Sequence, residues 1–222
     1  MISSKHFLLV LFCVFTLLGC QPIDYNPSPT YDNYFPVVIN DTKEYFVTSI
    51  QHTSFGKDTS TYFLKEILTE DFIDDEGDLA YRMERFWKVD SLAEYQIKDV
   101  WVTKKKMRSA ELVEENERFI KMIFPLTHYV FWDGNAYNSR PSQEYVIEGL
   151  HDYYTINGFE FDSTVTIMQH QKSNLIEYEI AKEVYAMDIG LIYKEDILIN
   201  INNGNVADVN YGSEYRKELI DY

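Results

Sequence analysis

After about the first forty residues, apolar and polar positions alternate with a period of two along much of the chain. The segment 159–169 is the clearest case, because its two phenylalanines, Val165 and Ile167 fall on one face and mainly acidic residues and threonines on the other. Side chains of a β-strand point alternately to opposite faces, so this pattern predicts a strand. The segments 45–50 and 79–89 have the same period and are also predicted strands.

Short polar turns, each containing a glycine, separate these runs. Asn-Gly and Asp-Gly pairs suit tight hairpins because both residues tolerate positive φ angles. About nine strands joined in this way predict an all-β fold, an antiparallel meander that forms a curved sheet, a sandwich or a half-barrel, with at most one or two short helices. The turns are 55–58, 74–78, 132–135, 157–158 and 202–205.

Two segments do not follow the alternation. Residues 109–115 begin with Ser109 and continue with good helix formers, which predicts a short helix or a bend. Residues 213–222 are similarly ambiguous, with Ser213 a candidate N-cap.

Segments 46–50 and 62–72 are apolar on both faces, although a half-exposed sheet needs only one apolar face. A sandwich with some strands buried on both sides is the interpretation that we favour. The alternative is a curved sheet whose concave face holds an apolar ligand.

The N-terminus has a different pattern. Lys5 and His6 precede an apolar run from Phe7 to Leu18, and Gly19 and Cys20 follow it. Twelve residues span about 18 Å as a helix, less than the roughly 30 Å of a bilayer core, so the run is typical of a secretion signal. An ordinary cleaved signal and an uncleaved anchor remain as alternatives.

Leu17-Leu18-Gly19-Cys20 resembles the lipobox of bacterial lipoproteins. The resemblance implies that Cys20 receives a diacylglycerol and that the preceding residues are removed. We therefore expect a lipoprotein signal peptide over 1–19, an acylated Cys and proline-rich tether over 20–36, and a single β-rich domain over 37–222. Part of the tether could instead dock on the domain through Tyr31, Tyr34 and Phe35.

Tyr34-Phe35-Pro36, followed by Glu44-Tyr45-Phe46-Val47, is similar to the start of uncharacterised lipoproteins from Bacteroidetes, although Val37 replaces their usual leucine. This resemblance implies location and fold and brings no known activity with it. The residue after Cys20 is Gln21, whereas enterobacterial lipoproteins that stay at the inner membrane have an aspartate there. This difference favours the outer membrane, and the sequence does not indicate which of its two faces. Further matching stretches are 124–126, 132–135, 183–186 and 190–195.

Acidic residues outnumber basic ones by 36 to 20, so the net charge is −16. This charge repels nucleic acid, which we exclude as a partner. Cys13 lies in the signal and Cys20 is the acylation site, so no cysteine is left for a disulfide in the mature domain.

Candidate chemistry is sparse. Asp74, Asp75, Glu76 and Asp78 form a weak calcium candidate, since their spacing differs from that of an EF-hand loop. The histidines after the signal have no metal-ligand spacing, no catalytic motif is present, and we expect no cofactor. These histidines are His52, His128, His151 and His170.

The leading hypothesis is therefore a lipid-anchored protein of the cell envelope that acts as a non-catalytic binding or accessory module. Its partners would be the membrane, through Cys20, and either an apolar ligand or an envelope protein. An envelope hydrolase using two carboxylates and a purely structural lipoprotein are the alternatives.

Cys20→Ser should move the protein from the membrane fraction to the soluble fraction, because firm anchoring requires more than one acyl chain and all of them depend on this thiol. Fractionation and immunoblotting would measure the shift. A variant that stays in the membrane fraction would contradict the lipobox assignment.

Overall fold

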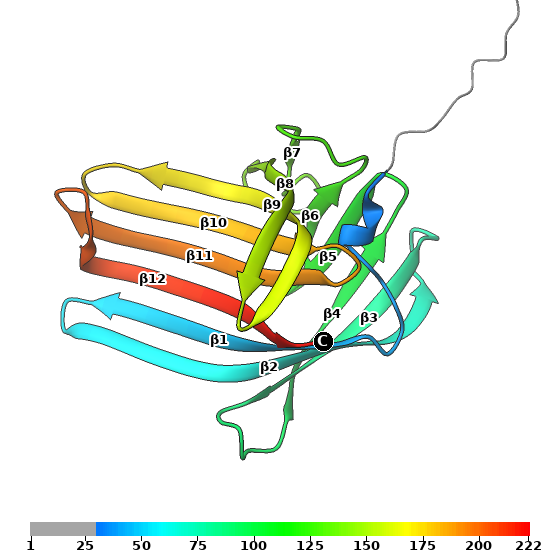
Figure 1. Ribbon diagram of the computed structural model, residues 1–222, viewed down its shortest axis with the longest axis horizontal. Coiled ribbons are helices and arrows are strands. Elements are labelled where there is room, and N and C mark those ends of the chain that lie inside the picture. The colour runs from blue at the N-terminus through cyan, green and yellow to red at the C-terminus, as the bar shows by residue number, and fades with distance from the viewer. Residues whose placement is uncertain (1–29) are drawn as a thin grey trace, which may run out of the picture.

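The computed structural model describes residues 30–222, so the predicted signal peptide, Cys20 and the tether up to residue 29 lie outside the described residues (Figure 1). The described chain forms one short 3₁₀ helix and twelve strands in a single antiparallel sheet. The elements are η1 (Asp32–Tyr34), β1 (Thr42–Thr53), β2 (Gly56–Ile73), β3 (Leu79–Lys88), β4 (Gln96–Lys105), β5 (Ser109–Glu114), β6 (Glu117–Ile123), β7 (Phe131–Asp133), β8 (Glu144–Ile156), β9 (Phe159–Ser173), β10 (Glu177–Ala186), β11 (Gly190–Asn202) and β12 (Asn205–Asp221).

The sheet order is β6-β5-β4-β3-β2-β1-β12-β11-β10-β9-β8-β7. The first and last strands therefore pair in the middle, and the chain runs outward from them as two meanders. β6 and β7 are consecutive in sequence and yet form opposite edges of the sheet. The segment between them must bridge those edges, which forces the sheet to curve.

The two edges meet through hydrogen bonds between β6 and the residues in and after β7. The Ile120 N–H donates to the carbonyl oxygen of Gly134 at 2.9 Å, and the Trp132 indole donates to the carbonyl oxygen of Ile120 at 2.8 Å. The Asn138 amide donates to the carbonyl oxygen of Arg118 at 3.0 Å. These bonds satisfy backbone groups that an open edge would leave to solvent.

Apolar packing fills the region where the edges meet. Tyr34 of η1, Met122 of β6, Ile147 of β8 and Tyr185 of β10 belong to one buried cluster. A second cluster joins the β8–β9 hairpin to the centre of the sheet and includes Phe161, Tyr193 and Leu219. The curved part is therefore held by contacts between strands that are distant in the sheet order.

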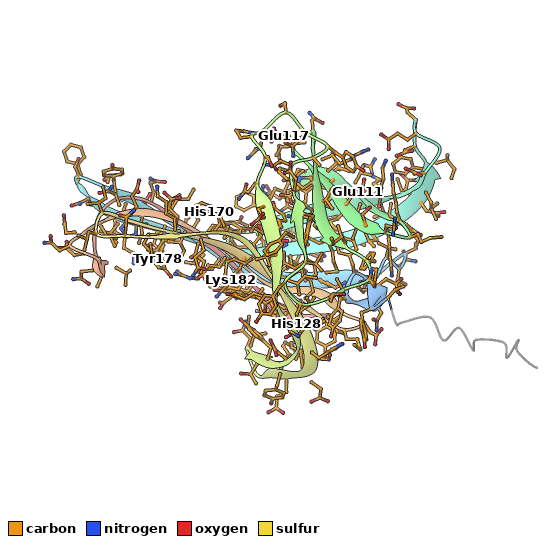
Figure 2. The ribbon with its side chains drawn as sticks, turned by 90° about the horizontal axis from the view of Figure 1, so that it is seen from above. Glu111, Glu117, His128, His170, Tyr178 and Lys182 are labelled. Carbon is orange, nitrogen blue, oxygen red and sulfur yellow. The ribbon has the colours of Figure 1, made fainter. Side chains whose placement is uncertain are left out.

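The long strands extend beyond the curved part as a single layer, where Figure 2 labels His170 and Tyr178. Ile180, Ile197 and Ile201 form a small cluster of their own there. Gly212 lies in this layer at φ +131°, where a Cβ atom would collide with the backbone of Leu198, so the close approach of β11 and β12 requires glycine.

The prediction of an all-β antiparallel fold with a curved sheet is confirmed, with twelve strands in place of about nine. The favoured sandwich is wrong, because the described strands belong to one sheet. The outer face of β1 and β2, which suggested burial on both sides, is instead covered locally. Phe46 and Phe63 pack on each other at 5.5 Å between ring centroids, and the ammonium group of Lys88 lies over the rings of both Phe63 and Tyr95.

Neither of the two segments that do not follow the alternation forms a helix. Residues 109–114 form β5 and pair with β4 and β6, and residues 213–221 belong to β12 and pair with β1. Pairing on both sides satisfies the backbone of each segment, which outweighs its local helix propensity.

The turns at 74–78 and 157–158 lie where predicted, between β2 and β3 and between β8 and β9. The first turn lies earlier than the predicted 55–58, because β1 ends at Thr53 and β2 begins at Gly56. Residues 30–36 of the expected tether lie against the domain, and Tyr34 is fully buried. Within residues 30–222, no helix has the length and apolar character needed to cross a bilayer.

Candidate functional site

A cavity of about 330 Å³ lies inside the curve of the sheet. Strands β1 to β6 and β10 to β12 contribute to its wall, and the segment after η1 closes part of it. One section of the wall is apolar, and aromatic rings and twelve charged residues, six acidic and six basic, make up most of the rest. The apolar section includes Val37, Ile67, Leu68, Met83, Leu112 and Leu191.

The first charged cluster joins β6 to β10 across the interior. Lys121 lies 2.8 Å from both Glu183 and Glu114. Lys194 lies 3.3 Å from Glu183, and the Tyr185 hydroxyl donates to the other oxygen of Glu183 at 2.6 Å. Glu183 and Lys121 are almost completely buried, so water screens their attraction little.

The balance of burial and charge sets the pKa values in this cluster. Burial alone would raise the pKa of Glu114, but Lys121 and Lys194 outweigh it and lower that pKa to about 2. The pKa of Glu183 is lowered further for the same reasons. Burial would lower the pKa of Lys121, but Glu114 and Glu183 raise it instead. All three groups are therefore charged at neutral pH.

The second charged cluster lies on β2, β3, β4 and β12. Glu66 accepts hydrogen bonds from Arg85 and Lys217, both at 3.0 Å. Arg85 also donates to Asp99 at 2.8 Å, and its guanidinium stacks on the Trp101 ring at 3.4 Å from the centroid. Trp101 also lines the cavity, and the contact with Arg85 restrains the orientation of its ring.

Lys217 differs from the other basic groups in the wall. Burial lowers its pKa, Glu66 opposes that effect, and the nearby charges of Arg85 and Lys194 add to the lowering. Its ammonium group lies 4.3 Å from the centroid of the Tyr45 ring. The ion pair with Glu66 joins β12 to β2 across β1, the strand that lies between them in the sheet.

A second hollow of about 830 Å³ adjoins the first. Five residues line both spaces: Glu114, Glu115, Lys121, Lys194 and Asp196. The remaining wall of the second hollow is more polar and includes Arg140, Gln143, Gln169 and His170. Residues of the first charged cluster therefore lie where the two spaces adjoin.

This arrangement suits binding better than catalysis. Among the described residues that line the smaller cavity there is no Ser, Cys or His. Its carboxylates are mostly engaged by lysines or by Arg85, so they lack the free proton-transfer geometry of an acid–base pair. A molecule with an apolar body and a polar end would match both sections of the wall.

Three of the four calcium candidates come together in the β2–β3 turn. Carboxylate oxygens of Asp74, Glu76 and Asp78 lie within 4.8 Å of one another, without Asp75. Lys104 contacts Asp74 and lies 3.2 Å from Glu76, and Lys106 pairs with Asp78. The protein's own cations therefore neutralise the group, and calcium binding stays an untested prediction.

The histidines have separate partners. His52 bonds to Glu214 at 2.7 Å and His170 to Glu179 at 2.6 Å. His151 lies 2.8 Å from the Tyr34 hydroxyl and 3.1 Å from that of Ser163, which fastens η1 to β8 and β9. His128 lies beside the Tyr129 ring. Cys20 lies outside the described residues, so its lipidation stays a prediction.

Sequence reasoning missed the charged residues of the cavity wall. Charged positions on strands normally face water, so Glu66, Arg85 and Glu183 carry no signal of burial in the sequence. Lys121 is the exception, because it interrupts the apolar run 119–124. A lone charge inside such a run is costly unless it is paired, and this could have indicated an internal ion pair.

No protein-family model matches the chain, and no curated protein matches it. Two solved structures resemble it. One, from Bacteroides fragilis, is named as an exported protein with a YmcC-like fold; the identity is 12%, the match covers 83% of this chain and 96% of that chain, and the TM-score is 0.41. The other, named as a lipoprotein from Parabacteroides distasonis, is 13% identical over 87% of this chain and 100% of that chain, with a TM-score of 0.36. Neither name includes an enzymatic activity, and similarity at this level carries no inference about function.

The free energy of unfolding should fall as the pH decreases from about 4.5 to about 2. The folded-state pKa values of Glu114 and Glu183 lie below the ordinary 4.5, so their stabilising effect is complete above that pH and is lost as each protonates. Urea denaturation at several pH values would measure the slope. Glu114→Gln should flatten it, and Glu148→Gln, at an exposed position, should not. An unchanged slope in Glu114→Gln would contradict the assignment.

Proposed function

We propose that this chain is a lipid-anchored protein of the cell envelope, at the outer membrane, that binds a small amphipathic molecule without transforming it. The cavity of about 330 Å³ inside the curved sheet is the observation that carries the proposal. Its volume falls at the lower end of the roughly 300–1,000 Å³ typical of small-molecule sites. The lipobox-like residues Leu17 to Cys20 support the anchoring.

The composition of the wall supports an amphipathic ligand over a purely apolar one. Leu112 and Met83 offer apolar contacts, and Tyr62 and Trp101 offer flat aromatic surfaces. Paired charges such as Glu66 and Lys217 lie in the same wall. A ligand without polar groups would leave that section of the wall poorly solvated, which costs free energy.

A protein partner is supported less. An interaction surface is expected to be one apolar patch with a polar rim. The three most exposed large apolar side chains are Phe55, Leu92 and Met107, and each lies on a different turn. They do not come from one face of one element.

The proposal is tested by native mass spectrometry of the mature protein, isolated from its own membrane in lipid nanodiscs. We expect a non-covalent additional mass on the wild type that Leu112→Trp loses, because the larger side chain fills the cavity. Leu92→Trp introduces the same indole at a position that is 94% exposed, and it should retain the additional mass.

Thermal unfolding followed by circular dichroism would confirm that both variants are folded. A bare protein mass for the wild type, or the same adduct on both variants, would overturn the proposal.

A further inference from the structure

One acidic side chain in the cavity wall differs from the other charged groups. Of the twelve charged residues that line the cavity, ten form ion pairs and Glu115 accepts a long hydrogen bond from Trp101. The side chain of Asp196, on β11, has neither an ion pair nor a hydrogen bond with any of residues 30–222. It is half-buried, and its carboxylate oxygens are not fully buried, so water or a ligand can reach them.

The residues beside Asp196 offer it little compensation. Its cross-strand neighbours are Ala181 on β10 and Tyr215 on β12, a methyl group and an aromatic ring. Lys194 precedes it on the same face of β11, but Lys194 is engaged by Glu183 at 3.3 Å. His170 is engaged by Glu179.

Burial and the basic groups near Asp196 act on its pKa in opposite directions. Burial raises its pKa, Lys194 and His170 lower it, and the carboxylate of Glu183 raises it. A half-buried carboxylate that the protein leaves unpaired is a place where a ligand can supply the missing charge.

Asp196 lies where the two hollows adjoin, since it lines both of them. A cation paired with it could extend an apolar body past Tyr215 toward Leu112 in the smaller cavity. The Tyr215 ring beside the carboxylate provides an aromatic surface that also favours a cation. The net charge of −16 raises the local concentration of cations and lowers that of anions.

We propose that Asp196 is the recognition residue of the cavity and that its ligand is an organic cation, an ammonium or guanidinium group joined to an apolar body. This inference rests on the proposed small-molecule function and specifies the chemical class of the ligand. The ammonium group donates to the Asp196 carboxylate, and the apolar body replaces water along the aliphatic and aromatic wall.

Three probes with the same apolar body and different ends test the inference: 4-phenylbutylamine, 4-phenylbutanol and 4-phenylbutanoate. Each is titrated calorimetrically into the mature protein in lipid nanodiscs, with empty nanodiscs as the blank. We expect the amine to bind at least about tenfold more tightly than the alcohol, and the carboxylate to bind more weakly than both, because a charge-assisted hydrogen bond to Asp196 forms only with the amine.

Asp196→Asn preserves the shape of the side chain and removes its charge. It should lower the affinity for the amine to that for the alcohol and leave the affinity for the alcohol unchanged. Asp208→Asn, at an exposed position of β12, is the matched control and should keep the preference for the amine.

The melting temperature of Asp196→Asn should equal or exceed that of the wild type, because a half-buried unpaired charge is removed. This readout requires no ligand, and a lower melting temperature would show that Asp196 has a structural partner and overturn the inference.

Equal binding of the amine and the alcohol, or a preference that survives Asp196→Asn, would overturn the inference and leave the proposed function standing. If none of the three probes binds while the envelope-purified protein carries an adduct, the organic-cation class is wrong and the cavity still has a ligand. Absence of both would overturn the two proposals together.

Discussion

The buried ion pair between Lys121 and Glu183 is the interaction on which the curved structure depends. These residues belong to β6 and β10, which stand first and ninth in the order of the sheet, and yet their charged atoms lie 2.8 Å apart. An open, gently twisted sheet would hold them far from each other. The contact therefore requires the sheet to curve back on itself, and the hydrogen bond from the Ile120 N–H to the carbonyl oxygen of Gly134 closes the same side.

Burying such charges is not in itself a strong source of stability, because desolvation offsets much of the attraction. The arrangement favours one curvature of the sheet, since separating Lys121 from Glu183 removes the closest opposite charge of Glu183 and leaves it with Lys194 at 3.3 Å. Apolar packing around Tyr34 and Met122 supplies stabilisation next to it. A wall built from paired charges also cannot collapse as readily as an apolar core, so a cavity remains between Leu112 and Tyr215.

The all-β class and several turns could be predicted because they depend on local signals, such as Asn157-Gly158 and the alternation in 159–169. The curvature could not, because it depends on contacts such as that of Lys121 with Glu183, which are 62 positions apart, and Glu183 resembles an ordinary surface charge in sequence. The segments after Ser109 and Ser213 stayed ambiguous in sequence and form strands, because pairing on both sides of a strand outweighs local helix propensity. Asp196 carries no local signal, and only its neighbours in the fold distinguish it.

A double-mutant cycle on Lys121 and Glu183, measured by urea denaturation at neutral pH, tests the central claim most directly. Lys121→Met alone should cost about 3–5 kcal/mol, because it leaves Glu183 buried without its main partner. Lys121→Met combined with Glu183→Gln should cost less than the sum of the two single changes, with a coupling of about 1–3 kcal/mol. A single-variant cost below about 1 kcal/mol together with additive effects would show that the ion pair does not hold the sheet in its curve.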